Sequence, residues 1–121
     1  MTKRRDPAEC LPLTPAMFEV LIALADGEKH GYAVLKEVAR RSEGRVTLSP
    51  GTLYAIIRRF VSDGIVAESD ERPDAALDDE RRRYYRVTPF GRDVALAEAR
   101  RMETALGMAR AKSLIPRMKP A

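Results

Sequence analysis

Apolar and polar residues follow one another along this chain with the spacing of α-helices in four stretches. Apolar residues recur on shared helical faces in the stretches 15–26, 31–41, 50–63 and 89–114. Three of these stretches open with a threonine or serine followed by proline. This pair is favoured where a helix begins, because the hydroxyl caps the first turn and proline suits the first helical position. The pattern therefore predicts four helices.

Shorter stretches have the alternating pattern of β-strands. Residues 65–70 and 81–88 lie on either side of a polar segment that contains proline, which predicts a two-stranded hairpin. Residues 45–48 predict one further short strand. Three helices followed by a hairpin are the order of a winged helix-turn-helix. We therefore predict a mainly α fold with a small β-hairpin, a winged helix-turn-helix to which a long C-terminal helix is added.

The same pattern divides the chain into four parts. We expect a flexible N-terminal arm over residues 1–13 and a winged helix-turn-helix domain over residues 14–88. A C-terminal dimerisation helix should follow over residues 89–115, and a short tail over residues 116–121. A chain of 121 residues is long enough for one domain with one core and an appended element.

Two of the predicted helices have more apolar surface than a domain of this size can bury. The first is apolar around most of its circumference, so one of its sides should meet a partner. In the last helix, apolar residues are spaced alternately four and three positions apart, as in the seam between paired helices. We therefore predict a homodimer. The interface residues that these patterns predict are Phe18, Ile22, Ala95, Ala99, Met102, Leu106 and Ala109.

Charge is distributed unevenly along the chain, and its distribution indicates a polyanionic partner. The net charge is +4, and residues 40–59 contain five arginines and one acid, Glu43. Residues 68–80 contain seven acids and one arginine, Arg72. Lys and Arg side chains gain affinity for nucleic acids by displacing counterions from the phosphates. The basic segment includes the third predicted helix.

Several function classes find little support in the composition. The single cysteine, Cys10, and the single histidine, His30, exclude an internal disulfide and argue against a zinc site or a catalytic relay. We therefore expect no enzyme activity, no cofactor and no metal. No apolar run approaches the length of about 20 residues that a membrane span needs, and the N-terminus lacks the apolar stretch of a secretory signal. We expect a cytoplasmic protein that does not bind a membrane.

The third predicted helix has two chemically different sides. Its apolar side, which belongs in the core, consists of Leu53, Ile56, Ile57, Phe60 and Val61. On a helical wheel, the opposite side and its flanks contain Gly51, Ala55, Arg58, Tyr54 and Arg59. A helix that only packs in a core does not need this second side. Its small residues allow close approach to another surface, and its other residues offer hydrogen bonds and positive charge.

The beginning of this helix is suited to hold a phosphate. Ser49 can cap the helix, Pro50 takes the first position, and Gly51 places no side chain in the way. Free backbone N–H groups and the helix dipole favour an anion at such an end. DNA binding requires this combination, with Thr52 and the arginines offered to the major groove. We therefore predict that the helix binds double-stranded DNA.

Three segments of the sequence together form a pattern specific enough to indicate a family. They read LTPAMFEVLIALADGEKHGYAVLKEV, LSPGTLYAIIRRFVSDGIV and RRRYYRVTPFGR. In order and spacing they resemble the PadR-like family of transcriptional regulators over residues 13–92. The resemblance implies a winged helix-turn-helix repressor that binds operator DNA as a two-fold dimer. It also implies that the third helix enters the major groove and that a single C-terminal helix forms the dimer, as in short-form members.

The resemblance also assigns residues to the DNA interface. The family's contacting motif falls on Ser49, Pro50, Gly51, Thr52 and Tyr54, and its basic stretch falls on Arg58 and Arg59. Ala55, on the same outer side of the helix, is also expected to face the DNA. The sequence departs from the motif at Ala55 and Ile56, where proline and leucine often stand. The wing departs further, since its tip carries acids that repel phosphate: Asp74, Asp78, Asp79 and Glu80. We therefore expect the wing to contact DNA through its base, at Arg81, Arg82 and Arg83.

Two functions are compatible with these observations. The first is a dimeric, sequence-specific DNA-binding regulator that acts as a repressor. The second is a winged-helix module for protein–protein contact that has lost specific DNA binding, which the acidic wing favours. Some members of the family bind a small-molecule effector at the dimer interface. The resemblance allows an effector here, although no residue of the chain indicates its identity.

Overall fold

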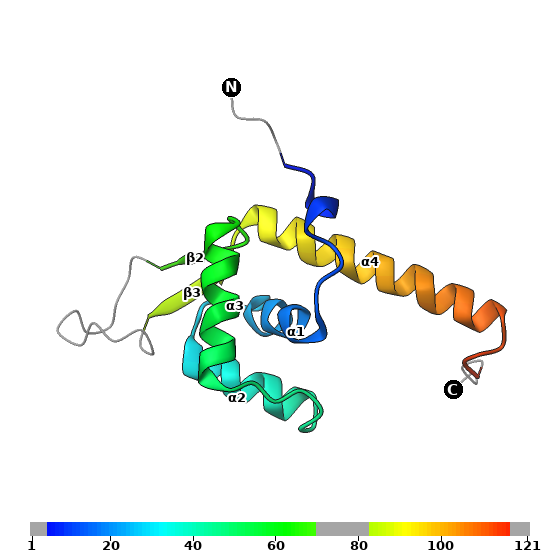
Figure 1. Cartoon of the computed structure of the whole chain (residues 1–121), viewed down its shortest axis with the longest axis horizontal. Coiled ribbons are helices and arrows are strands. Elements are labelled where there is room, and N and C mark those ends of the chain that lie inside the picture. The colour runs from blue at the N-terminus through cyan, green and yellow to red at the C-terminus, as the bar shows by residue number, and fades with distance from the viewer. Residues whose placement is uncertain (1–4, 70–82, 117–121) are drawn as a thin grey trace.

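The computed structural model describes residues 5–69 and 83–116 of the chain. They form a mainly helical fold with a small antiparallel sheet, as the sequence predicts (Figure 1). In chain order the elements are a 3-10 helix η1 (Pro7–Cys10), α1 (Pro15–Leu24), β1 (Lys29–His30), α2 (Gly31–Arg41), α3 (Pro50–Ser62), β2 (Val66–Glu68), β3 (Tyr84–Val87) and α4 (Pro89–Ala111).

The helices begin where the sequence predicts, because side chains satisfy the first free N–H groups. Thr14, Ser49 and Thr88 each accept a hydrogen bond from the backbone N–H three residues further on, at 3.0–3.1 Å. A proline follows each of them at the first helical position. The Nδ1 atom of His30 caps α2 in the same way, at 3.1 Å. His30 is therefore a structural residue at a helix start.

The sheet has three strands in the order β1-β3-β2, one more than the predicted hairpin. The third strand is β1, where Lys29 pairs with Tyr85. The strand predicted over residues 45–48 is wrong, because this segment is a loop. Its Val46 bonds through both backbone groups to the hydroxyl of Ser42, with N–O and O–O distances of 3.0 and 3.2 Å, so its backbone closes a turn.

The hydrophobic core lies between the first three helices, the sheet and the first turns of α4. Its largest fully buried apolar side chains are Phe60, Leu21, Leu24, Leu53, Ile57 and Ile65. The helical period places Tyr32 on the apolar side of α2 with Val34 and Val38, but Tyr32 is 52% exposed. Its ring lies 4.7 Å from the Lys36 ammonium, so it forms part of the outer surface of α2 instead.

The connection between the wing and α4 is tightly fixed. The hydroxyl of Thr88 donates to the carbonyl of Gly64 at 2.6 Å, and the Thr88 N–H donates to the carbonyl of Ile65 at 3.0 Å. Gly91, in the first turn of α4, is buried against this carbonyl, and a Cβ atom there would overlap it. The TPFG segment therefore holds the start of α4 to the turn between α3 and β2.

Two predicted boundaries need correction. The N-terminal arm, predicted to be flexible, packs against α4 from Arg5 onward and includes η1. Leu13, at the end of this arm, is 8% exposed and belongs to the hydrophobic core. The last helix ends at Ala111 and not at residue 114 or 115, because Ser113 adopts a left-handed φ of 62°. In Figure 1, α4 extends well beyond the rest of the domain.

Candidate nucleic-acid interface

The structure gathers most of the predicted DNA-binding residues on one exposed face of α3. Seven of them are exposed: Ser49, Pro50, Gly51, Thr52, Ala55, Arg58 and Arg59. The opposite face supplies the core with Leu53, Ile57 and Phe60, each at most 2% exposed. Core packing therefore fixes which side of α3 faces outward. A Cβ atom added to Gly51 would meet nothing within 4 Å, so this end of the helix is open.

Tyr54 is the exception, and its predicted position on the outer face is wrong. Its side chain is only 8% exposed and packs against the first residue of α2. A Cβ atom at Gly31 would lie 2.5 Å from the Tyr54 hydroxyl oxygen, so the absence of a side chain there makes room for the ring. The Tyr54 ring consequently lies between α3 and the start of α2.

The N-terminus of α3 offers fewer free donors than the sequence suggests. Proline at position 50 has no N–H, and the Thr52 N–H donates to the capping Ser49 at 3.1 Å. The Ser49 hydroxyl in turn donates to the Thr52 hydroxyl at 2.9 Å. The fourth N–H, of Leu53, already bonds to the Ser49 carbonyl. Within this first turn, the N–H of Gly51 is the group left to bind an anion.

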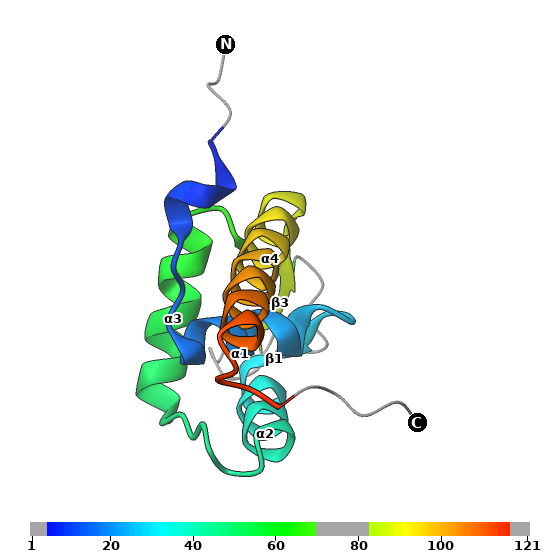
Figure 2. The same cartoon turned by 90° about the vertical axis from the view of Figure 1, so that its right-hand side faces the viewer.

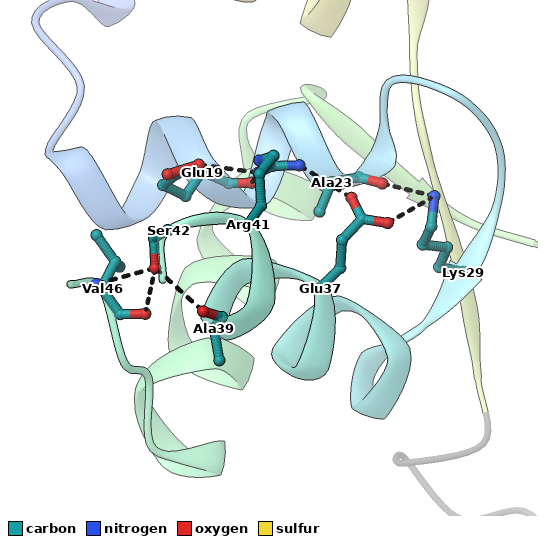
Figure 3. Close-up of polar contacts among 8 residues, drawn as sticks. All are labelled: Glu19, Ala23, Lys29, Glu37, Ala39, Arg41, Ser42 and Val46. Atoms are coloured by element: carbon teal, nitrogen blue, oxygen red, sulfur yellow. Dashed lines mark hydrogen bonds and ion pairs between the residues drawn. The ribbon is translucent and has the colours of Figure 1, made fainter. Parts of the chain in front are cut away.

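Two basic residues, Arg41 and Lys29, take part in a polar network that joins α1 to α2 (Figure 3). Arg41 lies 2.8 Å from Glu19 and 3.0 Å from Glu37, and also donates to the Glu19 carbonyl. Lys29 donates to the Ala23 carbonyl at 2.7 Å and lies 3.7 Å from Glu37. Acidic partners on α1 and α2 therefore offset the charge of these two cations, which hold the two helices together.

The remaining arginines of the basic segment are exposed. Arg40 and Arg45 lie on α2 and on the following turn, and Arg58 and Arg59 lie on α3. The Arg59 side chain is 71% exposed, with Asp63 at 3.8 Å. Such an ion pair is weak and screened by salt, so it leaves the positive charge available. Sequence reasoning did not name Arg40 or Arg45 as site residues, although both belong to the basic run.

The wing is described only at its base. Arg83 is half-buried, with its Nε atom 3.4 Å from Glu68 on the neighbouring strand. Arg86, which was not among the predicted residues, is exposed on β3 and donates to the Glu68 carbonyl at 3.4 Å. Arg81 and Arg82 lie outside the described residues, as do the acidic residues Asp74, Asp78, Asp79 and Glu80.

The predicted interface residues lie on α1 and α4. Ile22 is 37% exposed and Phe18 is half-buried on α1. On α4, Ala99 and Leu106 are exposed, and Ala95, Met102 and Ala109 are partly exposed. Beyond Glu98, α4 has no buried residue within its described length. An apolar stripe on a helix that leaves its own domain is the surface that a second chain would be expected to cover.

Hydrogen bonds shift the ionisation of three groups outside this interface. The hydrogen bond from Arg101 lowers the pKa of Glu98, the N–H of Leu13 lowers it further, and burial opposes both. The same pairing raises the pKa of Arg101. The hydrogen bond from Lys29 lowers the pKa of Asp26. None of these groups lies on the outer face of α3.

In residues 5–69 and 83–116, no three His, Cys, Asp or Glu side chains come together as a set of metal ligands. Within the same ranges, every helix is too short or too polar to cross a bilayer.

Comparison with known proteins identifies the family. The model of the "Transcriptional regulator PadR-like family" matches residues 20–97. The chain belongs to this family. It is 40% identical to the transcriptional regulator Rv3488 of Mycobacterium tuberculosis over 82 residues, which cover 68% of this chain and 69% of that protein. The PadR-like family and this relative are transcriptional regulators, not enzymes.

Solved structures show the same fold. A PadR family regulator from Eggerthella lenta is 28% identical with a TM-score of 0.60, over 84% of this chain and 82% of that chain. BpsR of Bordetella bronchiseptica is 26% identical with a TM-score of 0.62, over 93% of this chain and 74% of that chain. That structure concerns the regulation of BpsR's DNA binding by 6-hydroxynicotinic acid.

Proposed function

We propose that this PadR-like chain is a cytoplasmic, dimeric repressor that binds a palindromic operator. In this proposal, α3 of each copy enters the major groove of one half-site, and the two half-sites lie about one helical turn apart. The observation that carries the proposal is the outer face of α3, on which the small residues Gly51 and Ala55 lie next to the exposed Arg58 and Arg59.

Each exposed group then has a role. Gly51 offers its N–H to a phosphate at the helix end, while Ala55 lets the helix approach the bases. Arg58 offers the guanidinium fork that pairs with guanine, and Arg59 lies where it reaches the flanking phosphates. We propose that Arg81, Arg82 and Arg83, at the base of the wing, contribute to DNA binding through their positive charge alone.

The dimer in this proposal forms through α4 and α1. The stripe that contains Ala99, Met102 and Leu106 would pack against a second copy, because its alanines allow close approach. Light scattering of the full chain at micromolar concentration should give the mass of two chains. A stable monomer would remove the basis for binding a palindrome.

The decisive experiment is the selection of genomic fragments by the purified protein, followed by affinity measurements on the selected sequence and on shuffled controls. A repressor should prefer the selected palindrome by a factor of about 10³ or more over unrelated duplex at physiological salt. Equal affinity for every duplex would refute sequence-specific repression.

A second function retains support from one observation. The segment 68–80 contains seven acids, which favours a winged-helix module that contacts another protein and has lost specific DNA binding. The selection experiment separates the two functions, since such a module would enrich no DNA sequence.

Release by a small molecule is part of the proposal, and the effector regulation of BpsR by 6-hydroxynicotinic acid supports it by similarity. Weaker operator binding in the presence of an aromatic acid would reveal such an effector.

A further inference from the structure

Residues 5–13, which we call the N-terminal strap, connect the end of α3 to the middle of α4. The strap contains η1, and α4 packs more extensively against η1 than against any other element. In both views of the molecule the strap crosses α4 on the side on which α3 lies (Figures 1 and 2). Each end of the strap is held by a polar contact.

At the first end, one arginine side chain joins two helices. The Nη1 atom of Arg5 donates to the carbonyl of Asp63, the residue that caps the C-terminus of α3, at 2.5 Å. The guanidinium carbon also lies 5.0 Å from the centre of the Phe90 ring, in the first turn of α4. A cation is favourable at a helix C-terminus, and guanidinium groups stack well on aromatic rings. Arg5 therefore holds the end of α3 to the beginning of α4.

At the other end, a buried carboxylate fixes the backbone of the strap. The Leu13 N–H donates to the Oε2 atom of Glu98 at 2.6 Å. The Glu98 side chain is fully buried, and its second oxygen pairs with Arg101 on the next turn of α4. An unpaired carboxylate would be costly in this position, so both contacts are required to keep Glu98 there.

The strap matters because α3 and α4 are not themselves an extensively packed pair. We propose that the strap fixes the angle between α3 and α4, and that Arg5 and Glu98 are positioning residues that determine the operator spacing the dimer accepts. The inference rests on the proposed function, in which α4 joins two copies and each α3 reads a half-site. In such a dimer, a change of this angle moves the two recognition helices relative to each other. One base pair corresponds to about 3.4 Å along the DNA, so a small rotation alters the preferred spacing.

The test uses the full chain and the operator that the wild-type protein selects. One or two base pairs are inserted or removed between the half-sites, and affinity is measured for each spacing. The wild-type protein should prefer one spacing, and Arg5→Ala should reduce that preference by about tenfold. Arg5→Lys retains the charge but loses the planar fork, so it should reduce the preference as well. Arg110→Ala, in the exposed last turn of α4, removes one charge elsewhere and should retain it.

A measurement without DNA accompanies this test. Backbone hydrogen exchange in the last turn of α3 and the first turn of α4 should become faster in Arg5→Ala, while exchange in α2 stays unchanged. Two outcomes would overturn the proposal. If both Arg5 variants kept the wild-type preference for one spacing, Arg5 would have no part in setting it. If Arg5→Lys alone kept that preference, Arg5 would act only through its charge. Unchanged exchange would also overturn it. A wild-type protein that selects no operator would instead overturn the proposed function.

Discussion

Gly31 and Tyr54 are complementary, since the first residue of α2 leaves the space that the tyrosine ring of α3 fills. A Cβ atom at Gly31 would lie 2.5 Å from the Tyr54 hydroxyl oxygen and 2.7 Å from its Cε1 atom. The two residues belong to the HGY and LSPGTLY segments, which are separate in the sequence. Their contact sets how α3 is presented by the rest of the helix-turn-helix.

We expect Gly31→Ala to destabilise the protein by about 1–3 kcal/mol, because the added methyl group would force the Tyr54 ring to move. Thermal or urea unfolding of the full chain measures the effect. Gly51→Ala is the matched control, since nothing lies within 4 Å of the added atom. Equal stability of the two variants would contradict the role assigned to this contact.

Tyr54→Ala should lower stability before it affects DNA recognition. The side chain is 92% covered by the protein, and removal of a large buried side chain costs about 3–5 kcal/mol. Tyr54→Phe retains the ring and should therefore retain most of the stability and of the affinity for DNA. A Tyr54→Ala variant that is as stable as the wild type but binds the operator more weakly would instead support the direct DNA contact that the sequence motif predicts for Tyr54.

The helices and their starts could be predicted from the sequence because they depend on local chemistry. Thr14, Ser49 and Thr88 each cap the turn that follows them, so short windows of sequence contain the necessary information. The exposed basic face of α3 could be predicted for the same reason, since it follows from the helical period.

Contacts between distant segments could not be predicted in this way. The burial of Tyr54 depends on the glycine at position 31, and β1 is a strand of two residues that forms only by pairing with β3. The packed N-terminal strap depends on a bond from Leu13 to a carboxylate 85 residues further along. The sequence of the strap alone resembles that of an unstructured arm, because the carboxylate of Glu98 that fixes it lies on α4.

Arg58→Ala should weaken operator binding and relax its sequence specificity, because the proposed function pairs Arg58 with guanine. Loss of one phosphate contact lowers the magnitude of the slope of log K against log salt by about one, whereas loss of a base contact relaxes specificity and costs about 1–3 kcal/mol. Fluorescence anisotropy over a series of salt concentrations distinguishes the two outcomes. Arg41→Ala is the control, because its guanidinium is held by Glu19 and Glu37. It should lower stability and leave the salt slope unchanged.

Glu98 should make the stability of the protein depend on pH in the acid range. The hydrogen bond from Arg101 lowers the pKa of Glu98 in the folded state. The ionised Glu98 therefore stabilises the folded protein fully above the ordinary glutamate pKa of about 4.3. This stabilisation is lost as the pH falls through the lower pKa of the folded state. Urea unfolding at a series of pH values from about 7 to about 3 should show the free energy of unfolding decline. Glu98→Gln removes the titrating group and should give a flatter profile; an identical profile would show that other carboxylates cause the decline.

Gly91→Ala should disturb the junction between the wing and α4. The added Cβ atom would overlap the carbonyl oxygen of Ile65, which also accepts a hydrogen bond from the Thr88 N–H at 3.0 Å. Relief requires the first turn of α4 to move away from Ile65, so we expect the free energy of unfolding to fall by about 1–3 kcal/mol or more. Gly107→Ala is the control on the same helix, since nothing lies within 4 Å of its added atom and alanine favours helix by about 0.5–1 kcal/mol. Unfolding experiments should therefore give opposite signs for the two variants. A Gly91→Ala protein as stable as the wild type would show that α4 tolerates displacement at its first turn.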